Sequence, residues 1–162
     1  MSWGLCEKKG DILLPEYTKK IVKHPHLYIS LLTKSPKLPC VIFVHGGPGL
    51  NGALIEHLIG HEHIFSKLKY NIVVYDQRGC GRSKMTDEAV THGDNLIDLG
   101  DVYTSLKTYL SSEVVAIMGH SYGAKLVFDY DQLSGFKIPM VLVSMAPSSI
   151  TPRLTNLLLD LS

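Results

Sequence analysis

Four short apolar runs, rich in β-branched residues, alternate along the chain with segments of helical periodicity. A continuous apolar run of this length is typical of a strand buried on both faces of a parallel sheet. Strands that alternate with helices in this way predict an α/β fold, in which helices cover both faces of a mostly parallel sheet. The predicted strands are 40–44, 71–75, 113–118 and 139–145, and the predicted helices are 53–68, 94–110 and 121–133.

One further strand is expected before these units. Residues 26–33 (HLYISLLT) mix Tyr, Ile and Leu without a helical period, which favours an antiparallel strand. At the other end, residues 147–162 begin with a Pro/Ser/Thr-rich turn and finish with leucines at helical spacing. We expect this segment to be a helix that lacks its packing partner.

The charge balance excludes some classes of partner. The chain has 16 Lys and Arg against 15 Asp and Glu, a net charge of +1, so no basic stripe exists to neutralise nucleic acid or an anionic membrane. No apolar run approaches the ~18–20 residues that span a bilayer, and no signal peptide is recognisable. The cysteines Cys6, Cys40 and Cys80 follow no metal-ligand spacing. We therefore expect a cytoplasmic protein with reduced thiols.

The most specific motif is the pentapeptide Gly119-His120-Ser121-Tyr122-Gly123, which follows a predicted buried strand and opens a predicted helix. In this context Gly-x-Ser-x-Gly predicts a nucleophile elbow. Glycine at both flanks removes side chains that would collide with the neighbouring strand and helix. Ser121 would then stand at the positive end of the helix, where the Tyr122 amide can donate to an oxyanion. The alternative is a strand-to-helix turn without chemistry.

A second motif, His45-Gly46-Gly47-Pro48-Gly49, follows the first buried strand. Glycines around a proline make a rigid loop whose bare backbone N–H groups can approach a substrate, as an oxyanion hole requires. An ordinary tight turn is the alternative. We expect His45 to orient this loop.

A third motif, DQRGCGRS at residues 76–83, follows the second buried strand. Its glycines match neither a Walker loop nor a full Gly-x-Gly-x-x-Gly, so a phosphate site is not indicated. We interpret it as a structural loop beside the site, with its charges paired with each other.

In this order the three motifs resemble those of the α/β-hydrolase fold, and specifically of the prolyl aminopeptidase (proline iminopeptidase) family of serine peptidases, over about residues 26–162. The resemblance implies Ser121 as the nucleophile, the Gly47 and Tyr122 amides as oxyanion donors, and release of an N-terminal proline or other small residue from peptides. It also implies that residues 1–146 are the N-terminal part of the core and that 147–162 begin a lid. The elbow GHSYGA, without the tryptophan of many such enzymes, is similar also to tricorn-interacting aminopeptidases.

The catalytic triad is not complete in this sequence. In this fold the acid and the histidine follow the serine along the chain, yet all eight histidines precede Ser121. The downstream acids are Asp129 and Asp131, which fall in the helix after the elbow, and Asp160. The resemblance therefore implies the N-terminal half of an enzyme, with the last strands and both missing triad members lying beyond Ser162.

Two hypotheses remain open. The first is a serine hydrolase that acts on small peptide or aminoacyl substrates through Ser121. The second is an inactive, shortened paralogue that binds a partner or itself along strand 140–144, which would be an exposed edge. His57 and His61 lie beside glutamates but do not match His-Glu-x-x-His, so we expect a solvated helix surface and no metal or cofactor.

Overall fold

The computed structural model describes residues 17–47, 49–61, 68–84, 87–111, 113–135 and 139–143. These residues form one six-stranded sheet of order β1-β2-β4-β3-β5-β6 with helices on both faces, as the sequence predicts. The strands are β1 Thr18–Val22, β2 Tyr28–Thr33, β3 Cys40–Val44, β4 Asn71–Asp76, β5 Val114–His120 and β6 Met140–Val143, and the helices are α1 Ala53–His61, α3 His92–Leu106 and α4 Tyr122–Ser134.

Most of the sheet is parallel. Strands β4, β3, β5 and β6 run parallel to one another, whereas β2 pairs antiparallel with β4, which confirms the expected antiparallel strand. The sequence prediction missed β1, the antiparallel strand at the edge beside β2. Four of its five residues are exposed, and Lys19 and Lys20 break the apolar pattern. Lysines protect an edge strand from pairing with other chains, and they also hide it from a search for apolar runs.

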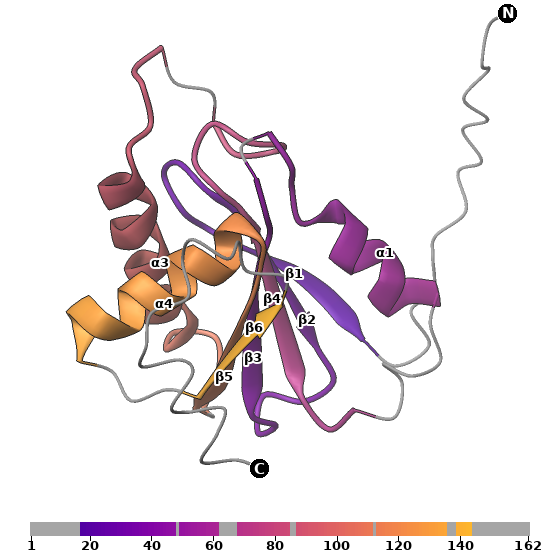
Figure 1. Cartoon of the computed structure of the whole chain (residues 1–162). Coiled ribbons are helices and arrows are strands. Elements are labelled where there is room, and N and C mark those ends of the chain that lie inside the picture. The colour runs from indigo at the N-terminus through magenta and orange to yellow at the C-terminus, as the bar shows by residue number, and fades with distance from the viewer. Residues whose placement is uncertain are drawn as a thin grey trace, which may run out of the picture.

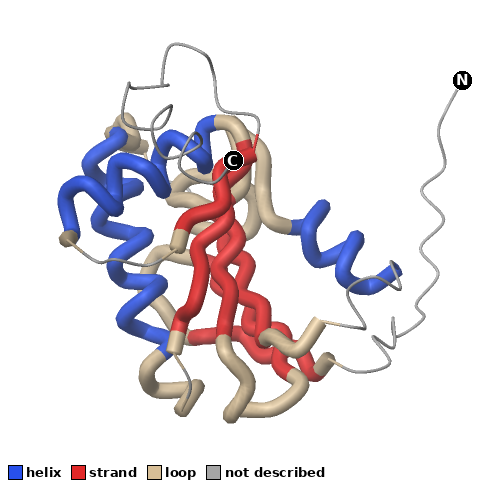
Figure 2. Tube along the Cα trace, turned by 60° about the horizontal axis from the view of Figure 1, so that its bottom comes forward, coloured by secondary structure: helices blue, strands red, loops and turns tan. Residues whose placement is uncertain are grey.

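The helices lie in two layers (Figures 1 and 2). Helices α3 and α4 cover one face of the sheet, which we call the closed face, and α1 lies on the other, which we call the open face. The closed face carries the larger hydrophobic core, in which residues of β2 to β5 pack against both helices. Its buried members include Ile42, Tyr75, Ile117, Leu99 and Leu126.

The smaller core lies between α1 and the open face. Ile59 of α1 packs there against Ile72 and Val74 of β4. Both Leu and Ile repeat at helical spacing in this helix, yet Leu54 is 65% exposed whereas Ile59 is buried. Only the position of the sheet decides which of these two sets is buried.

Helix ends follow local capping. Helix α3 begins at His92, two residues before its predicted start, because Thr91 and Asp94 form a capping box in which each side chain accepts from the other residue's backbone N–H. It ends at Leu106 rather than at residue 110, since residues 107–109 form a turn. Helix α1 ends at His61, and the remainder of its predicted range up to residue 67 lies outside the described residues. So does the predicted C-terminal helix.

Candidate active site

Ser121 lies at the junction of β5 and α4, in the backbone conformation that a nucleophile elbow requires. Its φ is 54° and its ψ is −119°, and it is the one non-glycine residue with positive φ in the described part of the chain. Such a conformation costs about 1–3 kcal/mol and persists only where the surroundings enforce it. The strand, the strained turn and the helix that the Gly-x-Ser-x-Gly motif predicts are therefore all present in the structure.

Glycines at both flanks make the elbow sterically feasible. A Cβ on Gly119 would lie 2.4 Å from the Gly123 carbonyl oxygen, and one on Gly123 would lie 2.4 Å from the Val44 carbonyl oxygen. Side chains do not approach backbone atoms this closely. Helix α4 thus packs directly on the ends of β5 and β3, and this contact sets the position of Ser121.

The Ser121 side chain is not used to cap the helix that it precedes. It makes no hydrogen bond to the backbone of α4, although serine at this position commonly does. The first N–H groups of a helix have no partner within the helix and carry partial positive charge. Ser121 Oγ and the Tyr122 amide therefore lie together at the positive end of α4.

The glycine-rich loop after β3 contacts the elbow. A Cβ on Gly46 would lie 3.0 Å from Ser121 Cβ and 3.0 Å from His120 Nδ1, so this part of the loop passes against the elbow. Gly47 and Gly49 follow with φ of 33° and 85°. Pro48 lies outside the described residues. The structure thus brings the two predicted motifs together, although they are more than seventy positions apart in the sequence.

His45 is held at the base of this loop. Its Nε2 accepts the Gln77 backbone N–H at 3.0 Å, so Nδ1 carries the proton and donates to the Gly46 carbonyl at 2.8 Å. The Gln77 side chain donates in turn to the His45 carbonyl at 2.7 Å. Burial lowers the pKa of His45, which favours the neutral ring. Both ring nitrogens are engaged, so His45 is suited to orient the loop and not to accept a proton from Ser121.

Asp76, the first residue of the third motif, links the loop before α1 to the loop after β4. Its carboxylate accepts the Gly52 N–H at 2.8 Å and the Arg82 backbone N–H at 2.7 Å, and it pairs with the Arg82 guanidinium at 2.8 Å. Burial acts to raise the pKa of Asp76, but the hydrogen bonds from Arg82 and Gly52 outweigh it, and the pKa is lowered. The expected pairing within this motif is confirmed for Asp76 and Arg82.

Arg78, in the same motif, differs from the expectation. It pairs with Asp98 of α3 at 2.6 Å and not with an acid of its own loop. The motif therefore links β4 to α3 on the closed face through Arg78. No local pattern in the sequence reveals a partner twenty residues away.

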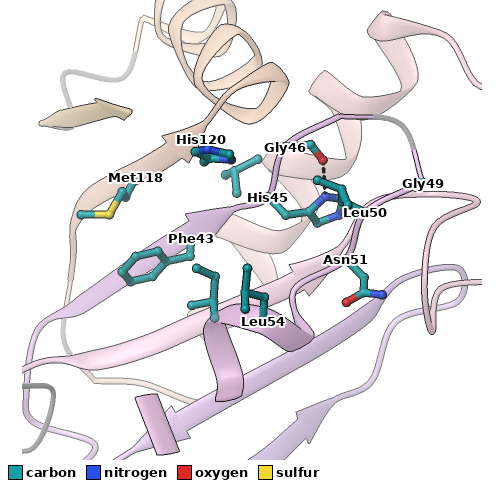
Figure 3. A pocket seen from close by; sticks show the side chains of 11 residues that line it. Phe43, His45, Gly46, Gly49, Leu50, Asn51, Leu54, Met118 and His120 are labelled. Carbon is teal, nitrogen blue, oxygen red and sulfur yellow. Dashed lines mark hydrogen bonds between the residues drawn. The ribbon is translucent and has the colours of Figure 1, made fainter. Parts of the chain in front are cut away.

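A hollow of about 380 Å³ opens on the open face next to the elbow (Figure 3). Phe43 of β3 and Met118 of β5 form its floor, Leu54 of α1 borders it, and His45 and His120 lie at its loop end. The lining is mostly apolar. His120, the second residue of the elbow, thus points to the open face and into this hollow.

No histidine hydrogen-bonds to Ser121 Oγ within the part of the chain that the structure describes. His45 is engaged as above, and His24 Nδ1 accepts the Leu27 N–H at 3.0 Å. His57 is exposed on α1. The downstream acid Asp129 lies in α4, as the sequence predicts, and pairs with His92 at 2.8 Å. The same described residues contain no cluster of three metal-ligating side chains, and none of their helices has the length and apolar character needed to cross a bilayer.

Sequence reasoning missed His92, which contacts the elbow. His92 Nδ1 lies 2.9 Å from Tyr122 Oη, and its Nε2 lies 2.8 Å from Asp129 Oδ2. His92 precedes Tyr122 by thirty positions and sits in a different helix. Because no motif includes it, only the packing of α3 against α4 identifies it.

The fold and the elbow define an α/β hydrolase. The sequence model of the "Alpha/beta hydrolase family" matches residues 41–161, and the chain belongs to this family. Among curated proteins, the proline iminopeptidase of Saccharolobus solfataricus is 29% identical over 132 residues, which cover 80% of this chain and 40% of that protein. The proline iminopeptidase of Lactiplantibacillus plantarum is 33% identical over 100 residues, 60% of this chain and 32% of that protein.

A solved structure gives the same result for the fold. The proline iminopeptidase-related protein of Thermus thermophilus superposes with a TM-score of 0.58 at 24% identity, over 80% of this chain and 44% of that one. The chain thus spans less than half the length of these relatives. Together the comparisons confirm the resemblance to prolyl aminopeptidases that the motifs indicate.

Proposed function

We propose that this chain carries the nucleophile and the oxyanion hole of a serine aminopeptidase. The enzyme releases N-terminal residues from small peptides, with proline as the preferred residue. The observation that carries the proposal is Ser121 in a strained conformation, with its hydroxyl not used as a helix cap. The names of the curated relatives support the substrate class.

In this reaction Ser121 Oγ attacks the carbonyl carbon of the scissile peptide bond and loses its proton to a histidine base. The negative charge that forms on the carbonyl oxygen is stabilised by the backbone N–H groups of Tyr122 and Gly47. The amine then leaves with the proton from the histidine, and water hydrolyses the acyl-enzyme. The histidine and its acid come from outside the described residues.

Contact between Gly46 and Ser121 supports Gly47 as the second donor. A Cβ on Gly46 would come within 3.0 Å of Ser121 Cβ, so the next peptide of the loop lies beside the nucleophile. His45 stabilises this position through both ring nitrogens. Gly49, the last glycine of the motif, lets the chain turn from the loop towards α1 with its φ of 85°.

The experiment that tests the proposal is labelling with a fluorophosphonate, read by intact mass. The reagent reacts with an activated serine, so one adduct on the wild-type chain and none on Ser121→Ala would show that a base reaches Ser121. Hydrolysis of proline and alanine p-nitroanilides by the same two proteins tests the substrate class. A folded wild-type chain that takes no label contradicts activity in this chain, since losing the base costs on the order of 10⁶ in turnover in a serine protease.

A second function, binding of a partner along a sheet edge, is favoured by the position of β6. Within the described residues β6 is the last strand of the sheet and pairs only with β5. An unpaired edge is a template for another strand. We expect concentration-dependent association in light scattering, reduced by Val141→Pro, which interrupts the edge. A monomer at all concentrations contradicts this function for a second copy of the chain.

A further inference from the structure

A polar cluster joins the first turn of α3 to the first turn of α4, directly behind the elbow. His92 Nδ1 lies 2.9 Å from Tyr122 Oη, and Asn95 Nδ2 donates to the same oxygen at 3.1 Å. His92 Nε2 lies 2.8 Å from Asp129 Oδ2. The two rings of His92 and Tyr122 meet edge to face, with centroids 5.7 Å apart.

The chemistry of the partners fixes where the protons lie. Asp129 as a carboxylate can only accept, so His92 Nε2 carries the proton and donates to it. In the neutral ring Nδ1 is then an acceptor, and the Tyr122 hydroxyl donates to it. Asn95 Nδ2 donates to the remaining lone pair of Tyr122 Oη. Every polar atom at the Tyr122 hydroxyl is therefore satisfied while His92 is neutral.

Tyr122 is the first residue of α4 and follows the strained Ser121. On one side of this turn Gly123 packs against the Val44 carbonyl, as described above. On the other side the Tyr122 phenol is held by His92 and Asn95 of α3. A strained residue keeps its conformation only when contacts constrain it from more than one side.

We propose that His92 is a positioning residue for the oxyanion hole: it holds the Tyr122 side chain through its hydroxyl, and thereby sets the direction of the Tyr122 backbone N–H. The catalytic meaning of this contact rests on the proposed function, whereas the contact itself does not. Protonation of His92 turns Nδ1 into a donor and removes the acceptor of the Tyr122 hydroxyl. The charged partner of His92 on α4 is Asp129, which also pairs with Lys125.

The test compares His92→Ala and His92→Asn with His57→Ala, a control at an exposed histidine on the other face of the sheet. Asn can present its amide oxygen near the position of Nδ1 and accept from Tyr122, whereas Ala cannot. The first readout is NMR on the whole chain: the imidazole nitrogen shifts of His92 and the amide cross-peak of Tyr122. The second is the rate of fluorophosphonate labelling of Ser121.

We expect the Nε2–H tautomer at His92, and a Tyr122 amide whose cross-peak depends on the contact with His92. His92→Ala should displace this amide, and His92→Asn should return it towards the wild-type position. The labelling rate should fall about tenfold in His92→Ala. Removal of an oxyanion donor itself costs about 10²–10³ in rate, so the loss in this variant should be smaller. Tyr122→Phe, which removes only the hydroxyl, should reproduce the displacement if His92→Ala does not fold.

The outcomes separate this inference from the proposed function. An Nδ1–H tautomer, or a Tyr122 amide that His92→Ala moves no more than His57→Ala does, overturns the inference even if Ser121 is labelled. Absence of label on the wild-type chain, together with the expected NMR pattern, contradicts the proposed function while the positioning contact stands.

Discussion

The two faces of the sheet differ in how completely they are covered. On the closed face α3 and α4 bury side chains such as Ile42 and Leu126 fully, with 0% exposed. On the open face α1 covers β4, while Phe43 and Met118 remain half-buried in the floor of the hollow and Leu54 is 65% exposed. Figure 2 shows the pair of helices on one side of the sheet and α1 on the other.

The closed face therefore contributes most of the stability, whereas the open face keeps the hollow accessible. The closed face supplies most of the buried apolar area, which is the main favourable contribution to folding. The elbow is also fixed from the closed face, because α4 and the residues that contact Tyr122 lie on that face. The glycine-rich loop after β3 lies at the border between the faces and is fixed by hydrogen bonds of His45 and Asp76. Substitutions should therefore have large effects on one face and small effects on the other.

The largest effect is expected at Gly123, where α4 meets β3. In Gly123→Ala the new Cβ would lie 2.4 Å from the Val44 carbonyl oxygen, so helix and strand must separate. We expect a loss of about 3 kcal/mol or more in the free energy of unfolding, measured by urea denaturation. Gly93→Ala in α3 is the matched control, since its Cβ meets its nearest atom at 3.6 Å and alanine favours a helix. Equal stabilities for the two variants would show that the close approach is not a constraint.

The same substitution on opposite faces tests the comparison directly. Leu126→Ala removes a side chain with no exposure from the closed-face core, and should cost about 2–5 kcal/mol. Leu54→Ala removes a largely exposed one, and should change the free energy of unfolding by about 0.5 kcal/mol or less. Thermal and urea unfolding of both variants measure the difference. Comparable losses would mean that the open face is covered in solution.

A smaller effect is expected where Asp76 joins the two loops at the border of the faces. Asp76→Asn removes a fully buried charge from its pair with the partly exposed Arg82, and should cost about 2–3 kcal/mol near neutral pH. The pKa of Asp76 is lowered in the folded state. Its contribution is therefore present above the unfolded pKa of about 3.9 and is lost as the pH falls towards the folded pKa. Urea titrations from pH 7 to 3 should show a shallower acid dependence in the variant, and identical slopes would contradict this assignment.

The smallest effect concerns His45, at the base of the glycine-rich loop after β3. Burial lowers its pKa, so as the pH falls below about 6.5 the unfolded chain binds the proton first and stability decreases. One proton contributes at most about 1.4 kcal/mol per pH unit. We expect this slope between pH 6.5 and 5 in the wild-type chain and its loss in His45→Asn. A wild-type stability that is constant over that range would show that His45 charges freely in the folded state.

Among the described residues, periodicity predicted every parallel strand and each helix, because a run such as 40–44 carries its own burial pattern. It failed where the pattern depends on a neighbour. Lys19 and Lys20 conceal β1, which is recognisable only once β2 is in place. The buried face of α1 runs through Ile59 and not Leu54, since the sheet and not the sequence chooses between two apolar stripes.

The elbow shows the same division. Gly-x-Ser-x-Gly between a strand and a helix identified Ser121 as a candidate, because the strained turn needs those glycines at those positions. The roles of Ser121, Gly47 and Tyr122 in catalysis stay predictions. The contact of His92 with Tyr122 could not be found in advance, since His92 reaches Tyr122 from a different helix, thirty positions earlier in the chain.

The sequence alone determined the order of strands and helices, the place of the elbow and the family resemblance, because these depend on residues within a few positions of each other. Only the tertiary structure decided which face of the sheet is closed, that the loop at Gly46 touches Ser121, and that His92 holds Tyr122. These contacts join residues distant in the sequence, and their geometry is set by how the helices pack on the sheet rather than by any local pattern.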